Sequence, residues 1–135
     1  VAYNVTCDDK KASVITDLGY YDDYTISNLT GSDMMLVEAN HDINMLQLGS
    51  YPYYLKQRIL GDKGHLSNET SARLINNLLN DHIKGIYLGH LENNYDKLAY
   101  ETVKLEIDMS ENEYKAGDIY IEVANRSEPS SLLEI

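Results

Sequence analysis

Residues 34–38 read Met34-Met35-Leu36-Val37-Glu38, four consecutive apolar residues followed by a carboxylate. A continuous apolar run of this length is typical of a β-strand covered on both faces, because a strand with one solvent face alternates apolar and polar residues. The run therefore predicts a central strand that lies parallel to a neighbour and carries Glu38 at its carboxyl end.

Two β-rich segments precede this strand, at residues 1–7 and 12–17, and the polar residues 8–11 separate them. This arrangement predicts an antiparallel hairpin whose second strand delivers Asp17 to its carboxyl end. Residues 1–5 already alternate as a strand and no Met comes first, so position 1 reads as the interior of a fold; a chosen boundary, proteolysis or further upstream sequence would each give this appearance. The Tyr- and Asp-rich stretch between Gly19 and Gly31 has room for a short helix.

The rest of the chain alternates between helical and strand periodicity. Helices are expected at residues 41–48 and 53–60, from Ser67 or Asn68 to residue 79, and at 96–109, and strands at 83–88 and 118–123. Strands alternating with helices indicate an α/β layered domain with one mixed sheet. We assign this domain to residues 1–125 and a polar tail to residues 126–135.

The composition and charge of the chain limit the functions that it can have. The 135 residues are 43% hydrophobic and 24% charged, as in globular domains, and all twelve aromatic residues are Tyr. The net charge of −11 repels a polyanion at long range, so chemistry on phosphate needs a local basic patch, a metal ion or surface supplied by other sequence. Cys7 is the single cysteine, and no signal peptide or apolar run near ~20 residues is present. We expect a cytoplasmic protein with no membrane partner.

Three polar side chains follow strands of the predicted sheet, namely Asp17, Glu38 and His90. Ligands of open α/β sheets gather at the carboxyl ends of the strands. A carboxylate and an imidazole are preferred ligands of Zn²⁺ and Mn²⁺, although a catalytic zinc ion takes about three protein ligands and a water. The spacing leaves two interpretations open: a metal site, or a capping Asp17 with a structural His90.

A basic stretch interrupts the acidic sequence at Lys56, Arg58 and Lys63, and His65 follows it just before a helix begins at Ser67 or Asn68. A helix amino terminus attracts anions, and an Arg side chain offers phosphate a planar fork of donors. This stretch therefore predicts a phosphate-binding surface that includes Ser67 and Asn68. The alternative is that Lys56 and Arg58 only solvate a helix and that His65 hydrogen-bonds locally.

Several blocks, taken in order, resemble one family. They are Thr16-Asp17-Leu18-Gly19, Met35-Leu36-Val37-Glu38-Ala39-Asn40-His41-Asp42, Leu55-Lys56-Gln57-Arg58-Ile59, Gly64-His65-Leu66-Ser67-Asn68 and Leu88-Gly89-His90-Leu91. The chain resembles YycJ (WalJ)-type metallo-β-lactamase-fold hydrolases from residue 1 to about residue 125. Ordered blocks are much more specific than a single motif.

The resemblance implies an αββα sandwich of which this chain is the carboxy-terminal half. It also implies that Asp17 bridges two metal ions and that His90 is the last His ligand. His65 would assist proton transfer beside the scissile phosphate, and Glu38 would orient that imidazole or cap the following segment. The family's His-x-His-x-Asp-His motif does not match any of the four histidines, so we expect the missing amino-terminal half to supply it.

The function implied is metal-dependent phosphodiester hydrolysis, with nucleic acid or a small phosphodiester as substrate and DNA exonuclease activity as one form of it. The resemblance implies two divalent ions, Zn or Mn, in the intact enzyme. With two ligands alone, this chain should bind metal weakly or not at all and be inactive, and its uncovered sheet face favours homo-oligomerisation. The alternative is an acidic, non-catalytic protein-interaction module. The roles of His41, Asn93 and Asn94 stay open.

Overall fold

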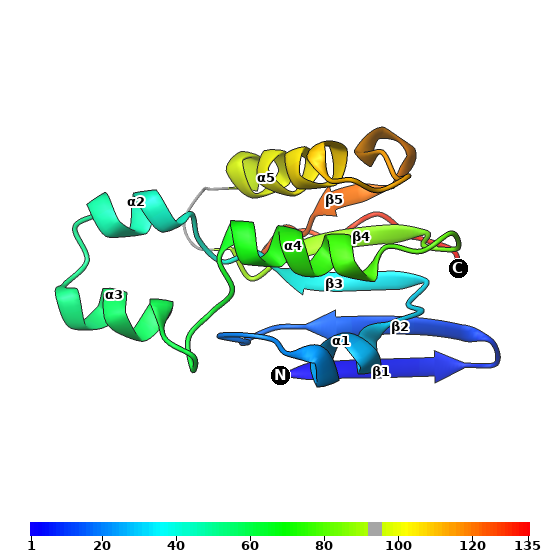
Figure 1. The fold of residues 1–135 in the computed structure, drawn as a ribbon, viewed down its shortest axis with the longest axis horizontal. Coiled ribbons are helices and arrows are strands. Elements are labelled where there is room, and N and C mark those ends of the chain that lie inside the picture. The colour runs from blue at the N-terminus through cyan, green and yellow to red at the C-terminus, as the bar shows by residue number, and fades with distance from the viewer. Residues whose placement is uncertain (92–95) are drawn as a thin grey trace.

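The computed structural model describes residues 1–91 and 96–135, and its centre is a five-stranded sheet (Figure 1). The strands follow one another in space as in sequence: β1 (Ala2–Cys7), β2 (Lys10–Ile15), β3 (Met34–Glu38), β4 (Gly85–Gly89) and β5 (Ile121–Val123). The β1 and β2 strands pair antiparallel, and every later pair is parallel. The predicted hairpin, the mixed sheet and the central position of β3 are confirmed.

In residues 1–91 and 96–135, five α-helices connect or follow the strands. They are α1 (Asp23–Leu29), α2 (Ile43–Leu48), α3 (Tyr53–Leu60), α4 (Asn68–Leu78) and α5 (Asp96–Met109), with a 3₁₀ turn at Ala116–Asp118. Side chains that accept bonds from free N–H groups set three of the starts: Asp22 from Thr25 at 2.8 Å, Asp42 from Met45 at 2.8 Å and Ser67 from Thr70 at 3.1 Å. No helix among residues 1–91 and 96–135 is long and apolar enough to cross a bilayer.

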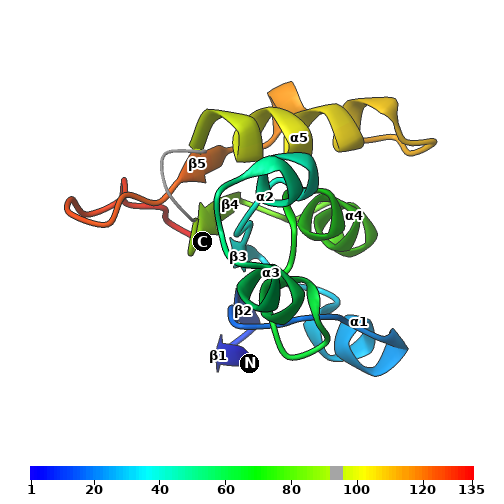
Figure 2. The ribbon, with the colours of Figure 1, turned by 90° about the vertical axis from the view of Figure 1, so that its left-hand side faces the viewer.

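The helices α1, α4 and α5 cover one face of the sheet (Figure 2). Alternation along the strands supplies the apolar surface for this contact: in β3, Met35 and Val37 are fully buried, whereas Met34 and Leu36 are half-buried. The core residues from the helices include Leu74, Ile75, Leu78, Ala99, Val103 and Ile107. One sheet with helices on one face is consistent with half of an αββα sandwich. Beyond the carboxyl ends of the parallel strands lie α2 and α3 (Figure 1).

The other face of the sheet carries the end of the chain (Figure 2). The Tyr87 hydroxyl donates to the backbone oxygen of Ser131 at 2.8 Å, and a Cβ added at Gly85 would lie 2.6 Å from Leu133 Cδ2. Together with Met34 and Leu36, residues 130–133 and Ile135 line an apolar cavity of about 460 Å³. The predicted tail therefore partly covers this face.

Some predicted boundaries differ from the structure by two or three residues. The second hairpin strand begins at Lys10 because Lys10 and Lys11 pair with Cys7 and Thr6 through the backbone, which needs no apolar side chain. It ends before Asp17, where a φ of 52° leaves the extended conformation. The last strand, predicted from residue 118, starts at Ile121, because a 3₁₀ turn occupies Ala116–Asp118.

Candidate active site

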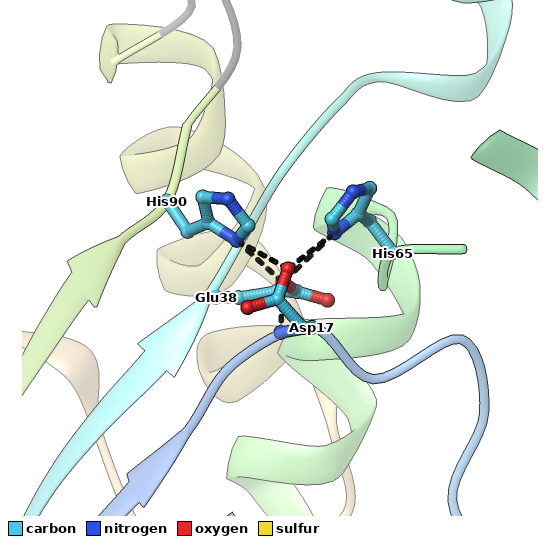
Figure 3. Close-up of side chains that lie close together, drawn as sticks. All are labelled: Asp17, Glu38, His65 and His90. Carbon is cyan, nitrogen blue, oxygen red and sulfur yellow. Dashed lines mark hydrogen bonds and ion pairs between the residues drawn. The ribbon is translucent and has the colours of Figure 1, made fainter. Parts of the chain in front are cut away.

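Four polar side chains meet at the ends of three adjacent strands (Figure 3). In β3 Glu38 is the last residue, His90 directly follows β4, and Asp17 follows β2 by two residues, while His65 comes from the loop before α4. Because β2, β3 and β4 are parallel and adjacent, their carboxyl ends meet at one edge of the sheet. One potential ligand atom from each of these residues lies within 4.8 Å of the others.

Glu38 is the buried centre of this cluster, with a side chain that is 0% exposed. Its carboxylate accepts three backbone N–H groups: from Asp17 at 2.7 Å, from Leu18 at 3.2 Å and from Leu66 at 2.6 Å. The donors come from the β2–α1 loop and from the loop before α4. Burying a carboxylate is costly unless its oxygens accept hydrogen bonds, and these three bonds meet that need. Through them, Glu38 joins the two loops to the end of β3.

Both imidazole rings turn the same nitrogen towards this carboxylate. The Nδ1 atom of His90 lies 2.9 Å from Glu38 Oε2 and that of His65 lies 3.3 Å from it, and the rings meet edge to face at 4.8 Å. A carboxylate only accepts, so each Nδ1 carries the proton when it bonds to Glu38. Their Nε2 atoms point away from the carboxylates (Figure 3). This arrangement leaves Nε2 as the coordinating or proton-transferring atom.

Asp17 is the exposed carboxylate of the cluster, with 58% of its side chain accessible. Its Oδ1 lies 3.6 Å from Nδ1 of His65 and 3.7 Å from Nδ1 of His90, and Thr16 Oγ1 donates to its Oδ2 at 3.3 Å. The expected proximity of Asp17 and His90 is therefore observed. Asp17 and His90 both have left-handed backbones, with φ of 52° and 53°. Non-glycine residues adopt this conformation at a cost, and in these two it turns the chain at the strand end.

The loop that carries His90 is held from two sides. Asn40 Nδ2 donates to the backbone oxygen of His90 at 2.8 Å, and Arg126 Nη2 donates to that of Leu91 at 2.5 Å. Neither contact was predicted from the sequence. Asn40 is part of a matching block and follows Glu38 by two residues, which is a usable signal. No spacing pattern points to Arg126, because it lies 36 residues beyond His90.

The donor set fits a divalent metal ion, but incompletely. Asp17 and His90 offer a carboxylate oxygen and an imidazole nitrogen, which are ligands of Zn²⁺ and Mn²⁺. The oxygens of Glu38 already accept five N–H groups, so Glu38 is better suited to orient the imidazoles than to bind the ion directly. Asp17 and His90 by themselves are fewer than the three protein ligands of a catalytic zinc site.

The predicted phosphate-binding residues separate into two groups. A cavity of about 440 Å³, called here the cluster cavity, is lined by Asp17, Arg58, Lys63, His65, His90 and Arg126 among others. Lys56 instead donates to the backbone oxygens of Gln47 and Gly49, both at 2.7 Å, and stabilises the turn between α2 and α3. Ser67 caps α4 and Asn68 is fully buried, and neither lines this cavity in the described part of the chain.

The remaining predicted polar residues lie elsewhere. His41 is buried and forms a β-bridge to Ser67. The His82 side chain is 55% exposed, and its Nδ1 lies 3.0 Å from Oδ1 of the buried Asp33. Asn93 and Asn94 lie outside the described residues.

The fold and the cluster define a class: an α/β domain with carboxylates and imidazoles gathered at the carboxyl edge of a mixed sheet. The particular type follows from comparison with curated proteins. Exodeoxyribonuclease WalJ of Streptococcus pneumoniae, in strains D39 and R6, is 47% identical over 103 residues, which are 75% of this chain and 38% of the relative. Exodeoxyribonuclease YycJ of Bacillus anthracis is 40% identical over 97 residues, which are 70% of this chain and 37% of the relative.

The matched part of the chain is therefore of the YycJ/WalJ type, and the resemblance predicted from the sequence blocks is confirmed. The match spans less than two fifths of the length of these relatives. No family model matches the chain. No solved structure matches it either.

Proposed function

We propose that this chain carries part of the active site of a metal-dependent exodeoxyribonuclease of the metallo-β-lactamase fold. The observation that supports this proposal best is the cluster of Asp17, Glu38, His65 and His90, which stands at one sheet edge in a chain similar to two proteins named exodeoxyribonuclease. An exodeoxyribonuclease hydrolyses phosphodiester bonds of DNA, so DNA is the proposed substrate.

We assign the roles from the contacts. Asp17 and His90 would each contribute one ligand to a site for two divalent ions, Zn or Mn, and the remaining ligands would come from sequence outside these 135 residues. When bound, such an ion supplies Lewis acidity at the phosphate. Glu38 is a positioning residue because it fixes both imidazoles through Nδ1.

His65 is the proposed proton donor to the leaving oxygen. It lies in the cluster cavity beside Arg58 and Lys63, where a phosphate is a natural neighbour, and its Nδ1 contact with Glu38 leaves Nε2 to carry the transferred proton. Arg58 and Lys63 would attract the phosphate in a chain whose net charge of −11 otherwise repels it. The substrate-binding role of Lys56, Ser67 and Asn68 stays a prediction. Lys56 and Ser67 bond to nearby loop and helix groups, and Asn68 is fully buried.

The experiment uses the protein expressed from the complete reading frame that encodes this chain. DNA labelled at one end is incubated with Mn²⁺ or Zn²⁺ and with EDTA, and His90→Ala and His82→Ala are compared. We expect stepwise release of nucleotides with metal, none with EDTA, and a loss of at least a hundredfold in His90→Ala alone. If the wild-type protein leaves DNA intact under all metal conditions, the non-catalytic interaction module is the better interpretation.

A further inference from the structure

A second cavity adjoins the cluster cavity. This flanking cavity has a volume of about 780 Å³ and is lined by Leu36, Leu91, Asp96 and Asn125, together with His90 and Arg126. His90 and Arg126 line both cavities, so the two spaces meet at these side chains. Both volumes fall in the range of roughly 300–1,000 Å³ that holds a small organic ligand, which is enough for a nucleotide unit in each.

Arg126 is an exposed cation at the junction. The one hydrogen bond that its side chain makes within residues 1–91 and 96–135 goes from Nη2 to the backbone oxygen of Leu91. A guanidinium has five N–H donors in a rigid fork, so this bond fixes its place beside His90 and leaves donors for a phosphate. Only Asp17 in the cluster cavity and Asp96 in the flanking cavity add an exposed carboxylate among the described lining residues.

We propose that Arg126 binds a backbone phosphate of a single DNA strand, next to the phosphate that faces His65. The strand would then pass from the flanking cavity into the cluster cavity beside His90, with Arg58 and Lys63 at one end and Arg126 at the junction. The proposal rests on the exodeoxyribonuclease function proposed above and adds a binding residue from beyond the last strand of the sheet.

The chain offers a matched control. Arg73 is an exposed arginine of α4 whose side chain donates to Thr70 Oγ1 at 3.3 Å and lines neither cavity. Arg126→Gln and Arg73→Gln remove the same charge and change the long-range field of the protein equally. A difference between them therefore reports a local contact with DNA.

The test measures binding of a fluorescent single-stranded oligonucleotide of about ten nucleotides to the protein from the complete reading frame. EDTA prevents cleavage, and the salt concentration is varied between about 50 and 200 mM. A phosphate contact with a single strand contributes about −0.7 to the slope of log K against log salt. We expect Arg126→Gln to lose about this much slope and roughly tenfold in affinity. Arg126→Lys should keep the slope, and Arg73→Gln should match the wild type.

A purely structural role for Arg126, as a clamp on the His90 loop, would not change the slope. Equal slopes for wild type, Arg126→Gln and Arg73→Gln would therefore overturn the proposal while leaving the nuclease function intact. Wild-type protein that neither binds the oligonucleotide nor degrades DNA would overturn this proposal and the nuclease function.

An activity assay adds a further comparison. On a mononucleotide ester, which has no neighbouring phosphate, Arg126→Gln should lower kcat/KM by a smaller factor than on the oligonucleotide. An equal or larger loss on the ester would count against a contact with the neighbouring phosphate.

Discussion

Glu38 Oε2 lies 2.9 Å from Nδ1 of His90, a residue 52 positions later in the chain. The bond joins the ends of β3 and β4, the two central parallel strands. The same oxygen also meets His65 and the backbone N–H of Asp17, so one buried atom orients the whole cluster.

Replacing Glu38 with Gln tests this central role. The amide has one accepting oxygen and places an NH₂ group among N–H donors, so we expect Glu38→Gln to lower the free energy of unfolding by about 3 kcal/mol. Urea denaturation followed by circular dichroism gives the value. Glu101 on α5 is an exposed control, and Glu101→Gln should change stability by less than about 0.5 kcal/mol. Similar effects for both variants would mean that Glu38 is not the centre of the cluster.

The 135-residue chain should bind Zn²⁺ or Mn²⁺ weakly, because Asp17 and His90 leave most coordination positions to water. Calorimetric titration should show small heats without a stoichiometric endpoint. His90→Ala should remove these heats, and His82→Ala should keep them, since His82 contacts Asp33 on another part of the molecule. A sharp endpoint near one or two ions per chain would show that His65 or Glu38 completes the site.

Substitutions of His65 and His90 should have different effects in the complete enzyme. His65→Ala should lower single-turnover rates by ~10²–10⁴-fold, as expected for loss of a general acid, with metal content nearly unchanged. His90→Ala should lower both the rate and the metal content. Elemental analysis of each purified variant, beside its rate on DNA, distinguishes the roles. The opposite pattern, an empty site in His65→Ala and a filled one in His90→Ala, would exchange the two assignments.

The loop that carries Asp17 packs closely on the loop before His65. A Cβ added at Gly19 would lie 2.1 Å from the backbone oxygen of Asp62. Because backbone cannot move aside cheaply, Gly19→Ala should cost about 1–3 kcal/mol and push Asp17 away from His65. Thermal denaturation measures the loss of stability, and the metal titration measures the effect of displacing Asp17. Gly117→Ala is the control, because a Cβ there meets no atom within 4 Å. If both substitutions were equally mild, the two loops would not be in contact in solution.

The buried Asp33 should make stability depend on pH. The backbone N–H of Lys11 and, to a smaller extent, His82 and Lys10 lower the pKa of its carboxyl below the ordinary 3.8, although desolvation opposes them. A lowered pKa in the folded state means that the stabilisation is present above pH 3.8 and is lost as the pH falls through the folded value. Asp33→Asn should therefore destabilise the chain at pH 7 and have a smaller effect near pH 3. Urea titrations at both pH values provide the check. A constant difference would exclude ionisation of Asp33 as the cause.

The sequence predicted the parts of the fold that depend on local patterns. The apolar run at Met34–Glu38 identified the central strand, and the alternation and polar turn in residues 1–17 identified the hairpin. Helix α3 has the bounds expected, since Pro52 and Gly61 border it on both sides. The strand ends were shifted because backbone pairing and left-handed residues, rather than side-chain hydropathy, determine where pairing stops.

The site was predictable only in part. Asp17 and His90 were placed together because both follow parallel strands, and Glu38 was placed beside His65. That Glu38 also meets His90 and three backbone N–H groups could not be read from the sequence, because backbone donors leave no trace in residue type. Arg126 was assigned to a polar tail, since contact with Leu91 depends on how the chain turns after β5.

At Asp17 and His90, the left-handed backbone places the requirements of the site in conflict with those of stability. Glycine adopts a φ near 50° without the steric cost that these two residues bear. A library of variants selected only for resistance to heat should therefore accumulate glycine at positions 17 and 90 and lose the cluster as it does so. Asp17 and His90 should be retained when the selection also requires activity, so comparing the two selections would show whether the site is in use.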